Sequence, residues 1–449
     1  MADVRPFRGL RYNPRKVSVQ NAVTQPYDKI SPEMQERYYA LDPHNIVRVI
    51  LGKGREGDSA EDNVYTRAAA KLREWRAGGV IEPIPLPSFW VYFQRFVIPG
   101  TAEHRVRKGF IGLGRLEDYS SQIVYPHERT LAGPKQDRLQ LLRHTRTHFE
   151  QIFMLYDDEE QRIDALLDSA TRLTPDIEVN DEYGVSHALW VLNEPSVLAQ
   201  IQKEMSGRKL IIADGHHRYE TALAYRDEQR AAGNSRPDAP HEWLPMTFFN
   251  MRSPALTVLP THRVVGGVKD FSAARFLEKA SEYFDVEDVD GRAETFSSAL
   301  VSSGHRGLTI GVAAEGGRRC ALLRQKSVDL FAPMGDLSPK QRTLDVAVLH
   351  RLLIERCLGI TEEAVKHENN ITYVREFDAA LRAVSTGRAQ IAFLLNPVRL
   401  DQMRDIVYEG NVMPQKSTDF YPKVLSGLVL YSLDDFTYRA ESRCAESRC

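Results

Sequence analysis

The chain is poor in cysteine, in net charge and in long apolar runs, and each shortage excludes a class of protein. Only four of its 449 residues are cysteine, too few and too scattered for a disulfide-stabilised scaffold. A formal net charge of −2 gives no basic field for general nucleic-acid binding. No apolar stretch approaches the roughly 20 residues that span a bilayer, and the first residues lack the apolar core of a signal peptide. We therefore expect a cytoplasmic protein that binds neither nucleic acid nor membrane.

What remains is the composition of an ordinary globular protein that is long enough for two or three domains. Apolar strand-like runs alternate with segments of helical periodicity over most of the chain, which predicts an α/β fold of mixed (α+β) type. The pattern changes character near residue 265, so we predict domains at 1–265 and 266–438. Residues 439–449 contain a short tandem duplication and are expected to form a disordered tail.

The most informative segment is a predicted strand that runs straight into a predicted helix through Asp214-Gly215-His216-His217-Arg218. Backbone N–H groups in the first turn of a helix have no partner within the helix, and the helix dipole adds positive charge there. Such a place suits an anion. Gly215 lets a ligand approach the backbone, and Arg218 can bind two phosphate oxygens at once. The pattern predicts a phosphate site formed by Gly215, His216, His217 and Arg218.

Two other interpretations of this turn compete with phosphate binding. Asp214 could merely cap the helix, with the two histidines on the surface. His216 and His217 could instead ligate a metal ion. Adjacent helical side chains point about 100° apart, however, so one ion cannot easily take both. Three donors packed directly after the glycine favour phosphate.

A second candidate is the segment 124–138, which two prolines and a glycine are expected to hold in an irregular loop. Loops carry a large share of catalytic residues. Glu128, beside His127, could act as a general base or hold a magnesium ion. Lys135 and Arg138 could neutralise phosphate charge. A solvated loop with ion pairs explains the same composition equally well.

Two proline-flanked segments are further candidates for contact with a substrate or a phosphate. One ends in His262 and Arg263, and the other contains Lys416, Ser417 and Thr418. The second segment could equally be a plain structural turn.

Taken together, these segments resemble the bacterial and archaeal family called domain of unknown function 1015. The resemblance extends over nearly the whole chain, and its name implies no activity. It is carried by Arg5-Pro6-Phe7-Arg8-Gly9, Pro26-Tyr27-Asp28, the run from His127 to Pro134, the Asp-Gly-His-His-Arg turn, Pro260-Thr261-His262-Arg263 and the run from Met413 to Thr418. The chain departs from the family pattern at Gln25, where a proline is expected, and at Glu150-Gln151, where Ser-Pro is expected. Either departure could alter substrate choice or activity.

A narrower resemblance links the turn to the ParB/sulfiredoxin-like superfamily, in which a Gly-x-x-Arg turn at a helix start holds nucleotide phosphates. Sulfiredoxin chemistry needs a cysteine where this chain has His216, and partition-type DNA clamping needs a helix-turn-helix and basic charge. The free-serine kinases of the superfamily are most similar in pattern, because they combine a Pro-His-Glu segment, here Pro126-His127-Glu128, with an Asp-Gly-His-His-Arg turn. This similarity implies a ParB/sulfiredoxin-like nucleotide-binding core within residues 1–265 and a second α/β region after it.

The resemblance implies a nucleotide-dependent small-molecule kinase with free L-serine as the expected acceptor. Glu128 would take the proton from the substrate hydroxyl, with His127 and Asp214 as further catalytic candidates. The turn would hold the donor, which is ATP, ADP or CTP with Mg²⁺. Lys135, Arg138 and Lys416 would offset charge on the moving phosphoryl group. The stretch of chain between the two motifs is much longer than in the compact kinases, and the C-terminal region is additional.

Two alternatives stay open at this point, and the sequence does not predict the oligomeric state. The first is a non-catalytic regulator that binds CTP or ATP at the same turn. The second is a metal-assisted phosphohydrolase that uses His127, Glu128, His216 and His262.

Overall fold

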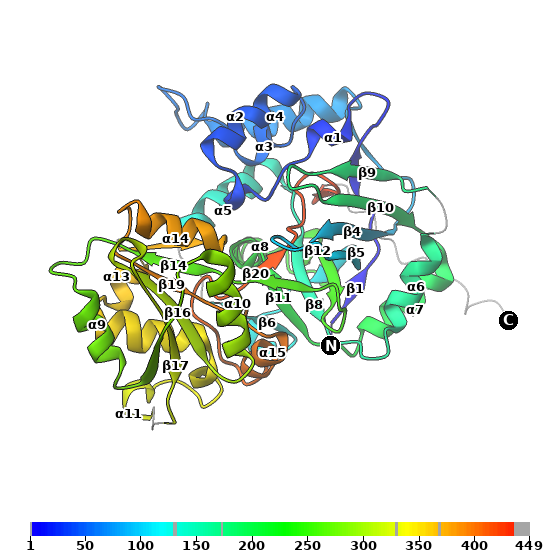
Figure 1. The fold of residues 1–449 in the computed structure, drawn as a ribbon. Coiled ribbons are helices and arrows are strands. Elements are labelled where there is room, and N and C mark those ends of the chain that lie inside the picture. Colours follow the sequence, from blue (N-terminus) through cyan, green and yellow to red (C-terminus); the bar gives the residue numbers. More distant parts are fainter. Residues whose placement is uncertain (1, 129–132, 172–173, 328–330, 367–369, 435–449) are drawn as a thin grey trace. The chain divides into compact units, whose positions relative to one another are not determined.

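A computed structural model describes residues 2–128, 133–171, 174–327, 331–366 and 370–434. The chain divides into two compact units (Figure 1). Unit 1 consists of Met1–Pro126, Thr130–Thr257 and Pro422–Cys449, and unit 2 of His127–Arg129 and Val258–Tyr421. The chain therefore leaves unit 1 after Thr257 and returns to it at Pro422. The predicted domain boundaries near 265 and 438 stay predictions, because compactness alone does not show which segments fold independently. The predicted tail, 439–449, lies outside the described residues.

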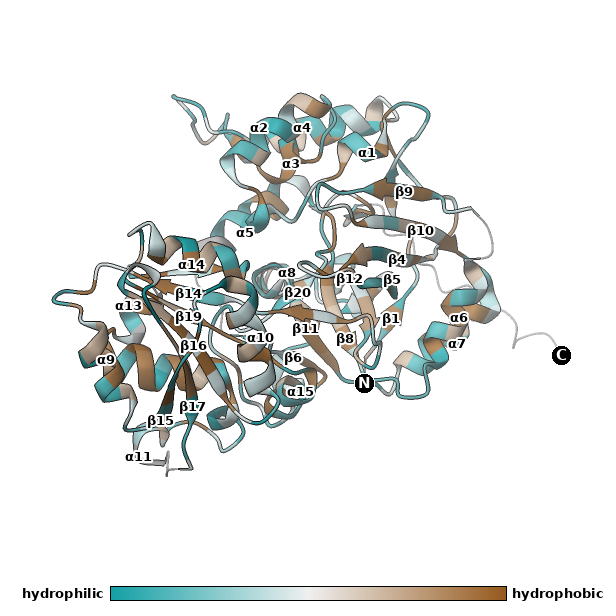
Figure 2. Ribbon diagram, viewed as in Figure 1, coloured by the Kyte–Doolittle hydropathy of each residue, from teal (hydrophilic) through white to brown (hydrophobic). Residues whose placement is uncertain are grey.

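Unit 1 is built on a nine-stranded sheet in the order β6-β11-β8-β12-β5-β4-β10-β9, with β1 beside β5. Most neighbours are antiparallel, while β11 runs parallel to β6 and β12 runs parallel to β8. The strands are β1 (Val4–Arg5), β4 (Phe89–Val97), β5 (His104–Arg115), β6 (Val124–Pro126), β8 (Ile152–Tyr156), β9 (Ile177–Asn180), β10 (Ser186–Leu192), β11 (Leu210–Asp214) and β12 (Trp243–Asn250). Every residue of β8 and β12 is buried, and Figure 2 shows how hydrophobic the strands are. These strands form the largest part of the core of unit 1.

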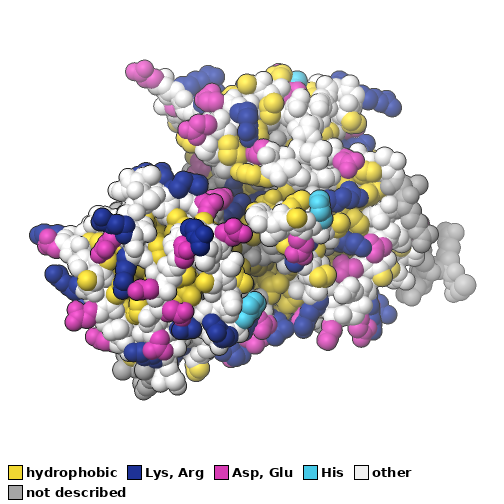
Figure 3. All heavy atoms as spheres, in the orientation of Figure 1, with side chains coloured by type: hydrophobic (Ala, Val, Ile, Leu, Met, Phe, Trp, Pro, Cys, Tyr) yellow, Lys and Arg dark blue, Asp and Glu magenta, His cyan; other side chains and the backbone are white. Residues whose placement is uncertain are grey.

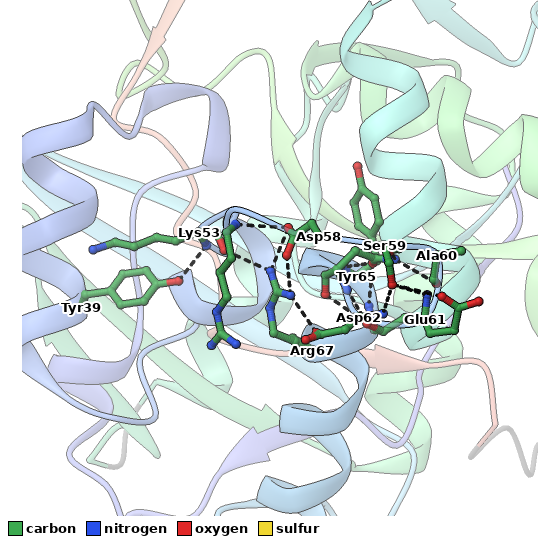
Figure 4. Close-up of polar contacts among 12 residues, drawn as sticks. Tyr39, Lys53, Asp58, Ser59, Ala60, Glu61, Asp62, Tyr65 and Arg67 are labelled. Atoms are coloured by element: carbon green, nitrogen blue, oxygen red, sulfur yellow. Dashed lines mark hydrogen bonds and ion pairs between the residues drawn. The ribbon is translucent and has the colours of Figure 1, made fainter.

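The helices of unit 1 are α1 (Val19–Ala22), α2 (Pro32–Leu41), α3 (Val47–Ile50), α4 (Val64–Ala77), α5 (Gly133–Thr145), α6 (Arg162–Ala170), α7 (Pro195–Met205) and α8 (His216–Ala231). Two of them, α2 and α4, begin at a side chain that caps the first turn. Ser31 caps α2 by accepting the N–H of Met34 at 3.2 Å, and Asn63 caps α4 in a capping box. One turn into α4, Arg67 donates to Asp58 and Asp62, each at 2.8 Å (Figure 4). Side-chain acceptors thus satisfy N–H groups that the helices leave unpaired.

The expectation that 124–138 forms an irregular loop is wrong. Residues 124–126 form β6, and α5 begins at Gly133, so Lys135 and Arg138 lie on a helix. Proline is well tolerated in the first turn of a helix, where the missing N–H would have had no partner. The buried side chains of Leu139, Leu141 and Leu142 then fix α5 against the core.

Unit 2 contains a six-stranded, antiparallel sheet in the order β15-β17-β16-β19-β14-β18. Its strands are β14 (His262–Val265), β15 (Phe284–Asp288), β16 (Thr309–Ala314), β17 (Arg319–Gln325), β18 (Ile371–Val374) and β19 (Ile391–Leu394). Its helices are α9 (Ala273–Ala280), α10 (Ala293–Gly304), α11 (Phe331–Met334), α12 (Asp345–Val348), α13 (Glu362–Lys366), α14 (Phe377–Ser385) and α15 (Leu400–Tyr408), and a π-helix continues α12 over Leu349–Cys357. The mixed α/β class predicted from the sequence is confirmed.

Short strand pairs complete the fold, and the surface is mixed in charge. β2 (Leu10–Tyr12) pairs with β3 (Ile81–Pro83), β7 (Thr147–His148) with β21 (Tyr431–Ser432), and β13 (Thr257–Leu259) with β20 (Asp419–Tyr421). On the face drawn in Figure 3, basic and acidic side chains are interspersed. Within the part of the chain that the structure describes, no helix combines the length and apolar character needed to cross a bilayer.

Candidate functional site

The predicted phosphate turn joins β11 to α8 in unit 1. Gly215 has φ +93° and ψ 25°, a left-handed conformation that only glycine adopts freely. A Cβ atom at this position would also lie 3.0 Å from Nη2 of Arg218. The backbone conformation therefore favours glycine, and an added Cβ would crowd the Arg218 guanidinium. Gly215, and not Asp214, is the residue before the first helical turn, and the two carboxylate oxygens of Asp214 bind cationic side chains. The interpretation of Asp214 as a simple helix cap is therefore wrong.

Asp214 instead binds two cationic side chains. Its Oδ2 accepts a hydrogen bond from Nη2 of Arg218 at 2.9 Å, and its Oδ1 accepts one from Nζ of Lys423 at 2.8 Å. Burial alone would raise the pKa of Asp214, but its attraction to Lys423 and Arg218 holds the pKa well below the usual range. Asp214 is therefore ionised near neutral pH and anchors both cations at the turn.

Arg218 is fixed from two sides beneath the turn. Besides its bond to Asp214, its Nη1 donates to the carbonyl of Gln151 at 2.7 Å. Burial would lower the pKa of the guanidinium, but Glu150 and Asp214 raise it. Arg218 thus keeps its charge although only 11% of its side chain is exposed. A fixed, charged guanidinium at a helix start is a preorganised partner for an anion.

The segment Tyr27–Lys29, a short 3-10 helix, lies beside this turn. Glu150 accepts the N–H of Tyr27 at 3.1 Å and the hydroxyl of Ser426 at 2.8 Å. Burial and Asp28 raise the pKa of Tyr27 to about 12, while Arg218 acts to lower it. In the sequence, the Pro-Tyr-Asp motif stands out only as a family feature and Glu150 only as a departure from the family pattern. The structure adds both to the surroundings of Arg218.

Lys135 and Arg138 on α5 already have protein partners. The Lys135 ammonium forms an ion pair with Glu220 on α8. Arg138 donates to the carbonyl of Ile50 at 2.7 Å, and its guanidinium lies 4.2 Å from the ring centroid of Tyr27. Their predicted contact with phosphate stays a prediction, as does that of His216 and His217, which begin α8 and are half-buried.

In unit 2, the carboxylate of Glu128 holds the loop that contains Lys416, Ser417 and Thr418. Its Oε1 accepts the N–H of Thr418 at 3.1 Å and the Thr418 hydroxyl at 3.2 Å, and its Oε2 accepts the N–H of Lys416 at 3.3 Å. Nε2 of His127 lies 2.6 Å from the same hydroxyl. The hydroxyl of Ser417 donates to the Pro414 carbonyl at 2.5 Å. Glu128 therefore shapes this loop, whatever else it does.

Arg263 holds the same loop through its carbonyl groups. Its Nη2 donates to the carbonyl of Lys416 at 2.9 Å and to that of Gln415 at 3.3 Å. Full burial lowers the pKa of this guanidinium to about 10, so it stays charged at neutral pH. The loop between Glu128 and Arg263 leaves Lys416 exposed in a left-handed conformation, with φ 54°. Unit 2 thus gathers six of the predicted site residues around one loop.

His262 is a neutral histidine of the core of unit 2. Burial lowers its pKa to about 4, and its Nδ1 accepts the N–H of Leu395 at 3.1 Å. Among the described residues, no group of three or more His, Cys, Asp or Glu side chains is placed to hold a metal ion. Of the four residues in the phosphohydrolase interpretation, His216 belongs to unit 1 and the others to unit 2.

Comparison with known families decides where the chain belongs. The family described as "Protein of unknown function (DUF1015)" matches residues 4–347, well over half of the chain. The chain is a member of the DUF1015 family. The resemblance predicted from the motifs is confirmed. No curated protein matches this DUF1015 chain in sequence.

Several solved structures are distantly similar to this DUF1015 protein. A mutant free serine kinase in complex with ADP is 12% identical, with 66% of this chain and 84% of that chain covered and a TM-score of 0.34. A conserved hypothetical protein from Pyrococcus furiosus is 10% identical, with 70% and 93% covered and a TM-score of 0.35. C-terminally truncated SbnI from Staphylococcus aureus is 10% identical, with 70% and 85% covered and a TM-score of 0.32. At these TM-scores the similarities carry no argument about function.

Proposed function

We propose that this DUF1015 protein binds the phosphates of a nucleotide at the Asp214–Arg218 turn and transfers a phosphoryl group to a small alcohol. The observation that carries the proposal is the start of α8 directly behind a left-handed Gly215, with a charged Arg218 fixed beside it. Helix starts of this kind bind anions because their N–H groups and the helix dipole face the ligand.

The charges beside the turn suit a polyphosphate. Arg218 and Lys423 carry two positive charges, which the nearby carboxylates of Asp214 and Glu150 balance. The N–H groups of the helix start and the donors of both cationic side chains favour a multiply charged anion. Magnesium would arrive with the nucleotide as part of the substrate. The likeness of the Pro-His-Glu segment and the turn to free-serine kinases makes free L-serine the proposed acceptor.

In the proposed reaction, the acceptor hydroxyl oxygen forms a bond to the terminal phosphorus as the phosphoanhydride P–O bond breaks. The nucleotide leaves with that bridging oxygen, and the hydroxyl proton passes to a base. Phosphoryl transfer asks a protein chiefly for positioning and charge neutralisation. Glu128 stays the predicted base. Because its carboxylate also shapes the 416–418 loop, its chemical and structural roles must be separated by experiment.

The direct test is product formation from L-serine and ATP, ADP or CTP with Mg²⁺, followed by mass spectrometry for O-phosphoserine. We expect product with at least one donor and its loss in Arg218→Gln. Arg67→Gln, which alters exposed ion pairs, is the matched control and should retain activity. Glu128→Gln should still bind nucleotide but form product at least about 100-fold more slowly if Glu128 is the base.

Other outcomes of this assay favour the alternatives. Nucleotide that binds but stays intact after long incubation with L-serine and other small alcohols would indicate a non-catalytic regulator. Release of inorganic phosphate without phosphoserine would indicate a hydrolase.

A further inference from the structure

Three polar side chains stand in register across neighbouring strands at the centre of the unit 1 sheet. His187 on β10 is paired with Gln94 on β4, and Gln94 is paired with Arg107 on β5. All three residues are fully buried, with 0% exposure. Buried polar groups are costly unless hydrogen bonds satisfy them. A row of three in the middle of a hydrophobic sheet therefore calls for a specific role.

At one end of the row, the His187 ring has polar partners at both of its nitrogen atoms. Nε2 of His187 lies 3.3 Å from Asp181, and its Nδ1 lies 2.6 Å from the hydroxyl of Tyr92 and 3.3 Å from Nε2 of Gln94. A proton on Nε2 makes Asp181 the acceptor and leaves Nδ1 to accept from Tyr92. Burial lowers the pKa of His187, which agrees with this neutral form. The ring is therefore fixed in one orientation.

Arg107 forms the other end of the row. Its Nε and Nη2 donate to Oε1 of Gln94 at 2.9 and 2.5 Å. Its guanidinium lies 4.6 Å from the ring centroid of Phe153 and 4.5 Å from that of Phe249. Burial lowers the pKa of Arg107 to about 9. Aromatic rings and the amide of Gln94 thus hold this cation in place.

Two residues of the row donate hydrogen bonds to Pro422 and Lys423, the first residues of the segment in which the chain returns to unit 1. Nε2 of Gln94 donates to the carbonyl of Lys423 at 2.8 Å, and Nη2 of Arg107 donates to the carbonyl of Pro422. The two adjacent carbonyl groups are thereby fixed from the sheet. Their fixation directs the Lys423 ammonium to Asp214, 209 positions earlier in the sequence.

We propose that Lys423 is a phosphate-binding residue of the Asp214–Arg218 turn, held in place by the buried row of Gln94, Arg107 and His187. This inference rests on the proposed nucleotide binding. Lys423 lies beyond the residues 4–347 that match the family, so nothing in that match assigns it. Its ammonium carries three donors, so it can keep Asp214 and also bind a phosphate oxygen. Gln94, Arg107 and His187 are positioning residues.

The test compares binding of ADP and adenosine to the full chain by isothermal titration calorimetry, for wild type and Lys423→Met. Lys108→Met is the matched control, because Lys108 also pairs with an aspartate, Asp168, at 2.6 Å, next to Arg107 in sequence. We expect Lys423→Met to weaken ADP binding at least 30-fold and adenosine binding less than two-fold. Lys108→Met should change neither.

A double variant separates phosphate contact from a merely structural role. If Lys423 only holds Asp214 in place, Asp214→Asn with Lys423→Met should bind ADP as well as Asp214→Asn alone. If Lys423 contacts phosphate, the double variant should bind ADP at least 10-fold more weakly than Asp214→Asn alone. Wild-type ADP affinity in Lys423→Met would overturn this inference and leave the proposed function standing. A wild-type protein that binds neither ADP nor tripolyphosphate would overturn both.

Discussion

The two units each contain a carboxylate to which the sequence drew attention, and the two carboxylates hold different kinds of partner. In unit 1, Asp214 binds two side-chain cations, Arg218 and Lys423. In unit 2, Glu128 binds two backbone N–H groups and a hydroxyl of one loop. Asp214 therefore controls the charge of its site, whereas Glu128 controls the conformation of a loop.

Removal of the two carboxylates should therefore have different effects on stability, because their partners differ in charge. Without Asp214, two largely buried cations lose their shared counter-charge, which costs more than the loss of neutral partners. Without Glu128, two N–H groups and a hydroxyl lose an acceptor, and Arg263 loses a nearby negative charge but keeps its bonds to the loop carbonyl groups. The two sites should thus respond differently to substitution, pH and changes in shape.

The largest expected effect is that of removing Asp214. Asp214→Ala should lower the free energy of unfolding by about 3–5 kcal/mol, because two largely buried cations, Arg218 and Lys423, lose the carboxylate that they share. Glu128→Ala should cost only about 1–3 kcal/mol, the usual range for unsatisfied neutral groups. Urea-induced unfolding of the two variants and wild type measures both. An equal or larger loss for Glu128→Ala would break the comparison.

A smaller loss is expected when the shape of the turn changes and its charges remain. Gly215→Ala forces an alanine into a left-handed conformation, which costs roughly 1–2 kcal/mol. Its Cβ also approaches the Arg218 guanidinium, 3.0 Å away. Thermal unfolding should show a lowered Tm, and ADP binding should weaken. Gly233→Ala, also at positive φ but with open space around its Cβ position, is the control and should leave ADP binding unchanged.

The smallest expected effect is a pH dependence of the stability that Asp214 contributes. Because its pKa is lowered on folding, Asp214 stabilises the fold above its unfolded pKa of about 4, and this contribution is lost as pH falls through the lower folded value. The stability difference between wild type and Asp214→Asn should therefore be constant from about pH 5 to 8 and shrink at lower pH. An undiminished difference at pH 3 would show that charge is not what Asp214 contributes.

Local features were predictable from the sequence because their causes are local. The predicted strand and helix on either side of Gly215 are present as β11 and α8, since apolar periodicity and the glycine act over a few residues. The loop predicted at 124–138 failed because proline and glycine also suit a helix start.

The residues that complete the turn could not be predicted, because long-range topology brings them there. Lys423 is 209 positions from Asp214, and only the return of the chain to unit 1 places it. Glu150 and Tyr27 are joined by a hydrogen bond across 123 positions. His187, Gln94 and Arg107 read as ordinary polar residues within strands, and only the strand register reveals them as one row. No periodicity or local motif encodes such proximity.

The central claim, that the Asp214–Arg218 turn binds a polyphosphate, is tested most directly by titrating wild type and Arg218→Gln with ADP at low and moderate salt. We predict saturable binding to wild type that weakens as salt rises, and a loss of at least 10-fold in Arg218→Gln with its fold intact by circular dichroism. Equal ADP affinity in the two proteins, or no saturable binding to wild type, would contradict the account.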